Sequence, residues 1–300
     1  MTTCFPTLDR LVARDHPGVA QESRTIAYVH PERRERAIVL LHGMSATPAQ
    51  FERLARALFE RGHNVLVPRL PHHGHANRLS TALERLRSEE LYDAGQRYLE
   101  IAGELGNVVT VAGFSLGGLL AACIGQRYAI DRCVPIAPFL GVSWIPNILM
   151  GPIAERLLRV PNRFHWWNPI LRERQFLATN GYPRYATHAI AYSYRVAREL
   201  LDRARTSRPL ASRMAIVTNS AEVAVNNYAI RRLYKSWRSA RPGDVELIML
   251  RGFPLSHDIV SPLRGSGRLA ERAHPHLLSA IDPISDCSCV TSAKTPQSAP

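Results

Sequence analysis

Short runs of apolar, often β-branched residues recur along this chain, separated by longer segments in which apolar residues return every three or four positions. The short runs predict buried strands and the longer segments predict amphipathic helices. The predicted strands are at residues 24–30, 37–41, 65–67, 108–112, 133–137, 214–218 and 245–250. The predicted helices begin near residues 47, 88, 116, 226 and 267, and each follows a strand.

The first of these helices shows why the boundaries are expected where they are. Residues 31–36 are charged and predict a turn before the strand at 37–41. Thr47 and Gln50 then have the spacing of a capping box, with Pro48 at the first helical position. Apolar residues follow at helical spacing from Phe51, and Gly62 is expected to end the helix.

Strands that alternate with helices of ten or more residues predict an α/β fold with a doubly wound, mainly parallel sheet. The alternation is interrupted by a long aromatic segment, which we interpret as an inserted, mainly helical cap. The chain is therefore expected to divide into a first core part at 1–137, the cap at 138–208, a second core part at 209–280 and a disordered tail at 281–300, where Ser, Thr, Pro and Asp dominate.

Composition and charge narrow the class of protein. With 300 residues, 46% of them hydrophobic, the chain is long enough to bury a sizeable core. The net charge of +13 would suit a polyanionic partner, but only Lys235 and Lys294 are lysine and the arginines are scattered. No run of five or six basic residues and no interleaving of basic with aromatic residues occurs, so we expect no nucleic-acid partner.

The cysteines and the N-terminal residues bear on the cellular compartment. The five cysteines are odd in number, with Cys123 and Cys133 in apolar surroundings and Cys287 and Cys289 in the expected tail, which does not indicate a disulfide framework. Residues 1–20 carry charges and no apolar core segment, and no stretch is long and apolar enough to predict a transmembrane helix. We expect a cytoplasmic protein of unknown oligomeric state.

The strongest chemical signal is the sequence Gly113-Phe114-Ser115-Leu116-Gly117, between a predicted strand and a predicted helix. In this arrangement the serine lies at the tip of a sharp turn, where neighbours without bulk are required. Its hydroxyl would lie at the N-terminus of the helix, which favours an anion developing on a substrate. Ser115 is therefore a candidate nucleophile, although it could also be an ordinary helix N-cap.

A serine nucleophile needs a base within hydrogen-bond reach and an acid that orients the base. His257 follows the last predicted strand, and Glu222 follows the strand before it. In a doubly wound sheet both loops leave the carboxyl ends of strands, at the same edge as Ser115. His257 could instead be a surface histidine, because only its position distinguishes it.

On these residues the chain resembles the α/β-hydrolase superfamily, within it the capped branch of monoacylglycerol lipases, bacterial carboxylesterases and serine aminopeptidase-like hydrolases. The resemblance spans residues 37–262 and includes Leu41-His42-Gly43, residues 70–75 and Ser256-His257. It implies a Ser115–His257–acid triad, with the backbone N–H groups of Met44 and Leu116 as an oxyanion hole. The chain departs from the family where Glu222 replaces the usual Asp and His73 replaces the usual Gly.

Two further groups of residues have competing interpretations. His72, His73 and His75, with His63, could suggest a metal site, but three ligands within four residues are poorly spaced for one tetrahedral ion. We expect no metal and no cofactor, and expect this loop to pack beside the turn that carries Met44. The aromatic residues of 138–208 could form the segment's own core or line a pocket, and the candidate substrate-binding residues are Trp144, Trp166 and Trp167.

The sequence therefore predicts a serine esterase, resembling a monoacylglycerol lipase, that acts on a small-molecule ester with an apolar acyl or alkyl group. Ser115 would attack the carbonyl, His257 would transfer the proton, and water would release the acyl group. A thioesterase, an amidase or peptidase, an acyltransferase and a non-catalytic binding protein on a hydrolase fold are the alternatives, because fold does not choose substrate.

Overall fold

A computed structural model describes residues 4–15, 18–172, 181–261 and 267–283. Its centre is a seven-stranded sheet in the order β1-β3-β2-β4-β5-β8-β9, in which β1 is antiparallel to β3 and the other pairings are parallel. The predicted α/β class with a doubly wound, mainly parallel sheet is thereby confirmed. The strands of this sheet are β1 (Ile26–Tyr28), β2 (Arg34–Leu41), β3 (Asn64–Val67), β4 (Gly106–Phe114), β5 (Arg132–Ile136), β8 (Arg213–Asn219) and β9 (Val245–Leu250).

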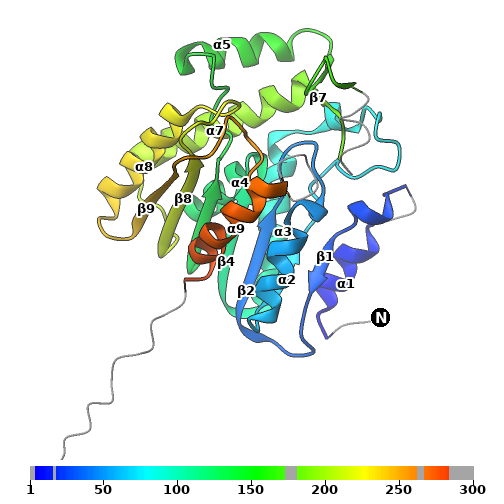
Figure 1. Ribbon diagram of the computed structural model, residues 1–300, viewed down its shortest axis with the longest axis vertical. Helices are drawn as coiled ribbons and strands as arrows, with labels where there is room; N and C mark the ends of the chain where they lie inside the picture. The colour runs from blue at the N-terminus through cyan, green and yellow to red at the C-terminus, as the bar shows by residue number, and fades with distance from the viewer. Residues whose placement is uncertain (1–3, 16–17, 173–180, 262–266, 284–300) are drawn as a thin grey trace, which may run out of the picture.

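Helices cover both faces of the sheet (Figure 1). One face packs against α2 (Glu52–Glu60) and α9 (Gly267–Ile281), and the other against α3 (Ser88–Leu105), α4 (Leu116–Arg127) and α8 (Asn227–Ala240). The helix α1 (Pro6–Ala13) packs on α3. Short 3-10 turns occupy Gln21–Ser23, Pro48–Phe51 and Ala82–Arg85.

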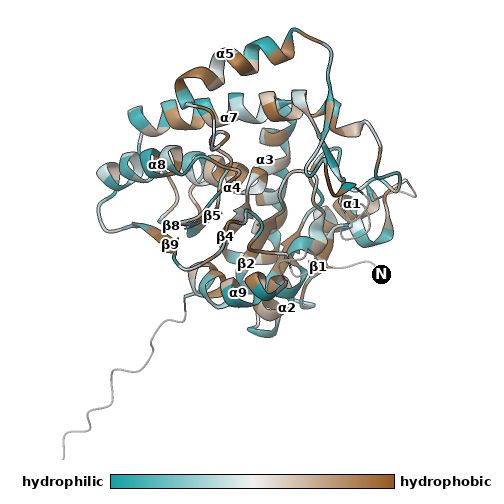
Figure 2. Ribbon diagram, turned by 45° about the horizontal axis from the view of Figure 1, so that its top comes forward, coloured by the Kyte–Doolittle hydropathy of each residue, from teal (hydrophilic) through white to brown (hydrophobic). Residues whose placement is uncertain are grey.

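The apolar residues concentrate where these layers meet (Figure 2). In β2, residues 37–41 are fully buried, as are all four residues of β3. The helix α4 is buried on every side, because the sheet lies beneath it and α3 and α7 flank it. This burial holds the N-terminus of α4, and Ser115 before it, in a fixed place.

Two boundaries predicted from the sequence are wrong. The charged residues 34–36 do not form a turn but begin β2, because Arg34 and Arg36 pair with Gly106 and Val108 of β4 while their side chains stay outside the core. The capping box of Thr47 and Gln50 does not form either: residues 48–51 adopt a 3-10 turn without a side-chain cap. The Gln50 side chain has other partners, described below.

The segment predicted as a cap contains α5 (Asn147–Leu158), α7 (Thr187–Thr206) and a hairpin of β6 (Phe164–Trp166) and β7 (Arg184–Ala186). In Figure 1 α5 lies farthest from the sheet, with α7 between it and the core. The hairpin was not predicted from the sequence. The division of the chain at residues 137, 208 and 280 stays a prediction, and residues 284–300 of the predicted tail lie outside the described residues.

Two further observations concern membrane-spanning helices and the cysteines. Within the described ranges, no helix has the length and apolar character needed to cross a membrane. Cys4, Cys123 and Cys133 are free thiols, and burial raises the pKa of Cys123 to about 12. The Cys123 thiol is therefore a buried apolar group of α4, as the sequence predicts, and it does not supply a thiolate.

Candidate active site

Ser115 lies on a strained turn between β4 and α4, with a φ of 55° that non-glycine residues rarely adopt. The turn is possible because its flanking glycines lack side chains. A Cβ on Gly113 would lie 2.2 Å from the carbonyl oxygen of Gly117, and one on Gly117 would lie 2.0 Å from that of Leu41. Both glycines are thus required by close backbone approach, as the predicted nucleophile turn demands.

The structure brings Ser115, His257 and Glu222 together although they are far apart in sequence. The Nε2 atom of His257 lies 2.9 Å from the Ser115 Oγ atom, and its Nδ1 atom lies 3.0 Å from each carboxylate oxygen of Glu222. With Nδ1–H donating to Glu222, the Nε2 atom is unprotonated and accepts from the Ser115 hydroxyl. The Phe114 ring packs against the imidazole, with centroids 4.7 Å apart.

The Glu222 carboxylate is fully buried and held by backbone as well as by His257. Its Oε1 atom accepts from the backbone N–H groups of Val223, Ala224 and Val225 at 2.9, 2.8 and 3.4 Å. Burial opposes ionisation, but the hydrogen bonds from His257 and the backbone outweigh it and hold the pKa of this carboxyl below its usual range. The extra methylene of Glu relative to Asp is accommodated because the chain turns around the carboxylate.

Asn219 connects the loops that carry the acid and the histidine. Its Nδ2 group donates to the backbone carbonyls of Pro254 and Ser256 at 3.0 and 3.1 Å, and its side-chain oxygen accepts from the Ala221 N–H. Asn219 is the last residue of β8 and is fully buried. One amide therefore fixes the position of the loop after β9 relative to the loop after β8.

The turn at residues 43–45 follows β2 and lies beside Ser115. The Gly43 N–H donates to Gln50, the Ser45 N–H donates to the Nε2 atom of His73, and the Ser45 carbonyl accepts from the Tyr182 N–H at 2.7 Å. In the described part of the chain, the N–H groups of Met44 and Leu116 donate to no protein acceptor. The turn thus holds its neighbours rigidly and leaves the Met44 N–H available.

Two buried histidines support this turn from below. The Nε2 atom of His42 accepts from the Leu70 N–H at 3.1 Å, and its Nδ1–H donates to the Gly43 carbonyl; His73 has the same tautomer, because its Nδ1–H donates to Pro71. Burial lowers the pKa of His42 to about 4 and that of His73 well below its usual value. Both are neutral hydrogen-bonding groups near pH 7.

Two of the other histidines that could have suggested a metal are engaged elsewhere. His72 pairs with Glu90 at 2.8 Å, and His63 pairs with Asp282 at 3.0 Å. In the residues that the structure describes, no group of three or more His, Cys, Asp or Glu side chains is arranged to hold a metal ion. The loop of residues 70–75 packs beside the 43–45 turn, as the sequence predicts.

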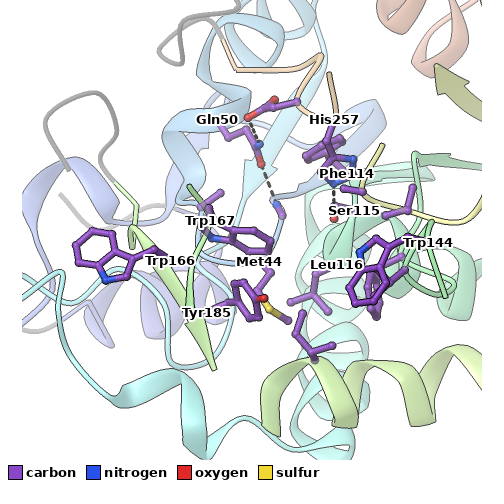
Figure 3. Close-up of a pocket in the computed structure, with 18 residues that line it drawn as sticks. Met44, Gln50, Phe114, Ser115, Leu116, Trp144, Trp166, Trp167, Tyr185 and His257 are labelled. Atoms are coloured by element: carbon purple, nitrogen blue, oxygen red, sulfur yellow. Dashed lines mark hydrogen bonds between the residues drawn. The ribbon is translucent and has the colours of Figure 1, made fainter. Parts of the chain in front are cut away.

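A cavity of about 380 Å³ lies beside Ser115 and His257 (Figure 3). Its walls are mostly apolar, and the predicted residues Met44, Leu116, Trp144, Trp166 and Trp167 all line it. Trp144 is nevertheless 77% exposed. Trp166 is the last residue of β6, and Trp167 directly follows it. The aromatic residues divide between the two interpretations, because Tyr182 and Tyr194 are buried in the interior instead.

Several cavity residues were not predicted from the sequence. Gln50 and Asp258 contribute polar groups, and the apolar walls include Phe114, Phe139, Val142, Tyr185, Ile190 and Val225. Phe114 could have been found, since it precedes Ser115 directly. The others come from segments whose approach to Ser115 has no local sequence signal.

Comparisons with solved structures agree with this fold. The chain is similar to a structure of the metagenome-derived lipolytic enzymes LipS and LipT (TM-score 0.63, 18% identity, 87% of this chain and 98% of the other). It is similar to the monoacylglycerol lipase of Paleococcus ferrophilus (0.64, 18%, 86% and 97%) and to a soluble variant of the monoglyceride lipase of Saccharomyces cerevisiae in complex with a substrate analogue (0.66, 14%, 86% and 90%). At these identities the likeness concerns the fold.

A comparison with curated protein sequences gave no match. The family profile described as Alpha/beta hydrolase family matches residues 38–279, which include every candidate catalytic residue and most of the chain. Together with the sheet order and the strained serine turn at the end of β4, this match assigns the fold. The chain belongs to the alpha/beta hydrolase family.

Proposed function

We propose that this protein is a serine hydrolase that cleaves carboxylic esters with an apolar acyl or alkyl group. The observation that carries the proposal is the continuous hydrogen-bonded chain from Glu222 through His257 to Ser115, with distances of 3.0 and 2.9 Å, at the base of an apolar cavity. A nucleophile, a base and an orienting acid in this order are what acyl transfer to serine requires.

In the first half of the reaction Ser115 Oγ attacks the ester carbonyl while His257 Nε2 takes its proton. The tetrahedral intermediate collapses as His257 returns that proton to the departing alcohol, leaving the acyl group on Ser115. In the second half His257 takes a proton from water, which attacks the acyl-enzyme, and the carboxylic acid leaves as Ser115 is reprotonated. Glu222 stays ionised and stabilises the imidazolium in both halves.

We assign the oxyanion hole to the N–H groups of Met44 and Leu116. Both residues line the cavity, Met44 within the 43–45 turn and Leu116 directly after Ser115, and neither N–H donates to another described residue. The Leu116 N–H is also at the N-terminus of α4, where the helix dipole favours negative charge. We assign Trp144, Trp166 and Trp167 to the wall that receives the apolar part of the substrate.

The test is covalent labelling together with turnover. A fluorophosphonate should add once to the wild-type protein, as measured by intact mass, and Ser115→Ala should abolish both the adduct and the hydrolysis of p-nitrophenyl esters. A panel of oxoester, thioester and anilide substrates with the same acyl chain then identifies the leaving group. A wild-type protein that neither labels nor turns over any of them, under conditions in which a control esterase does both, overturns the proposal.

A further inference from the structure

Gln50 joins two loops of the site that no backbone connection brings together. Its Oε1 atom accepts from the Gly43 N–H at 2.8 Å, and its Nε2 group donates to the Oδ2 atom of Asp258 at 3.0 Å (Figure 3). The Gln50 side chain is buried, and all three residues line the cavity. The amide thus spans from the turn that carries Met44 to the residue directly after His257.

The sheet order shows why such a link matters. The loop with Gly43 follows β2 and the loop with His257 follows β9, and β4, β5 and β8 lie between these strands. Four strand spacings separate their ends by roughly 19 Å within the sheet. The two loops therefore reach over the end of β4 from opposite sides, and the Asn219 contacts fix only the histidine loop to β8.

Asp258 is itself held so that it faces Gln50. Its Oδ1 atom accepts from the N–H groups of Val260 and Ser261 at 3.0 and 2.9 Å, which leaves Oδ2 toward the Gln50 amide. A carboxylate only accepts hydrogen bonds and the Gly43 N–H only donates, so the amide has a single compatible orientation. If the amide were turned over, two donors would meet at Gly43 and two acceptors would meet at Asp258.

We propose that Gln50, acting through Asp258, is a positioning residue that holds the oxyanion turn at a fixed distance from the His257 loop. The inference rests on the proposed function, because it concerns the same site. Reaction at Ser115 needs the Met44 N–H and the His257 imidazole placed together around one carbonyl, and misplacement of about 1 Å lowers rates by up to about 100-fold. Gln50 touches neither reacting atom and acts only through the two loops.

The first experiment compares Gln50→Leu with Gln126→Leu. Gln126 is a similarly buried amide that also bridges two segments, but it lies away from the cavity. It donates to the Ser207 carbonyl and hydroxyl and accepts from the Trp237 indole. In the folded fraction, Gln50→Leu should lower kcat about 10- to 100-fold with KM within about threefold, whereas Gln126→Leu should leave kcat within about twofold.

The second experiment reverses the donor and acceptor across the link. Gln50→Glu alone brings two carboxylates into contact. Asp258→Asn alone brings two amide NH2 groups into contact, because the Asn oxygen is held by the Val260 and Ser261 N–H groups. Each single change should therefore lower kcat. In the double variant the new carboxylate accepts from Gly43 and from the new amide, which still accepts from Val260 and Ser261. The double variant should therefore recover kcat at least tenfold relative to the worse single variant.

The inhibition constant Ki of a trifluoromethyl ketone that bears the acyl chain of the best ester is a measurement that does not change when a variant is merely less stable. The adduct of this ketone with Ser115 places an oxyanion in the hole, so Ki should rise in Gln50→Leu by the factor that kcat/KM falls. The positioning role is wrong if kcat and Ki in Gln50→Leu match those of Gln126→Leu, or if the double variant shows no recovery. In either case, turnover by the wild-type protein leaves the proposed function standing. Absence of wild-type turnover and labelling refutes the proposed function itself.

Discussion

The lower and upper walls of the cavity are held in different ways. The lower wall consists of backbone turns whose polar groups are hydrogen-bonded to buried partners, such as Glu222 to residues 223–225 and Ser45 to His73. The upper wall consists of aromatic side chains from the turn after β5 and from the β6–β7 hairpin, namely Trp144, Trp166, Trp167 and Tyr185. Trp144 and Trp167 are 77% and 39% exposed. Directional hydrogen bonds hold the lower wall in place, whereas apolar contact area holds the upper wall.

In the proposed enzyme, this difference separates two tasks within one site. Directional bonds fix atoms to fractions of an ångström, which acyl transfer requires. Apolar contact scales with area and tolerates changes of shape, so it suits a range of acyl groups. We therefore expect changes in the lower wall to alter kcat for every substrate, and changes in the upper wall to alter the preference among substrates.

The largest effect is expected from Glu222→Gln. In the proposed mechanism this change keeps the shape of the side chain but removes the charge that stabilises the imidazolium and fixes the His257 tautomer, so kcat should fall by about 10³ to 10⁴ for all esters. The measurement is kcat for Glu222→Gln beside Asp202→Asn, which alters a carboxylate of α7. A fall of less than about tenfold would mean that another group serves as the acid.

Acid should weaken the lower wall by destabilising the fold. His42 and His73 have depressed pKa values in the folded state, so the unfolded chain binds more protons below about pH 6.5, and stability falls as the pH drops from 6.5 toward 4. Between pH 7.5 and 5.0, His42 alone should cost about 2 kcal/mol. Urea unfolding at both pH values measures the loss, and unchanged midpoints would contradict the assigned neutral tautomers.

The upper wall should set the preference for acyl chain length. Each methylene buried against it contributes about 0.8 kcal/mol, so kcat/KM should rise about fourfold per methylene from acetate until the cavity is filled. Trp167→Ala should lower kcat/KM for octanoate about tenfold and leave acetate nearly unchanged, and Trp166→Ala and Trp144→Ala test the other two positions. A profile equally flat in wild type and variants would place these tryptophans outside the substrate path.

The smallest effect is expected at Tyr182, which contacts both the 70–75 loop and the 43–45 turn. The Tyr182 hydroxyl accepts from the His75 N–H and donates to the His72 carbonyl, both at 3.0 Å, while its backbone holds Ser45. Tyr182→Phe removes only the hydroxyl contacts and should cost about 1 kcal/mol in the free energy of unfolding, with kcat within about twofold. A tenfold fall in kcat would show that the 70–75 loop takes part in positioning the turn.

The features predicted from the sequence are those with a local pattern. The strand-turn-helix around Ser115 is encoded within residues 108–127, and the alternation of elements places residues 222 and 257 at the same edge of the sheet. Glu222 and His257 were predicted from the rule that parallel strands end together and from the resemblance to the α/β-hydrolase superfamily. Their distances follow from loop conformations that no pattern in the sequence specifies.

The errors occur where distant partners override local preference. Gln50 has the spacing of a capping residue, yet its amide binds Asp258, 208 positions away. The β6–β7 hairpin has three residues in each strand and pairs segments about 20 residues apart, so neither strand has a detectable alternation. Residues 34–36 look like a turn because all three are charged, while their backbone pairs with β4.

The position of β9 at the edge of the sheet has a consequence for synthesis of the protein. A chain that has emerged as far as α8, which ends at Ala240, already contains Ser115 and Glu222 but not β9 or the histidine beyond it. In the proposed enzyme, hydrolysis begins only when β9 pairs with β8 and α9 packs on the opposite face. The onset of ester cleavage during translation or refolding therefore times the addition of the last strand.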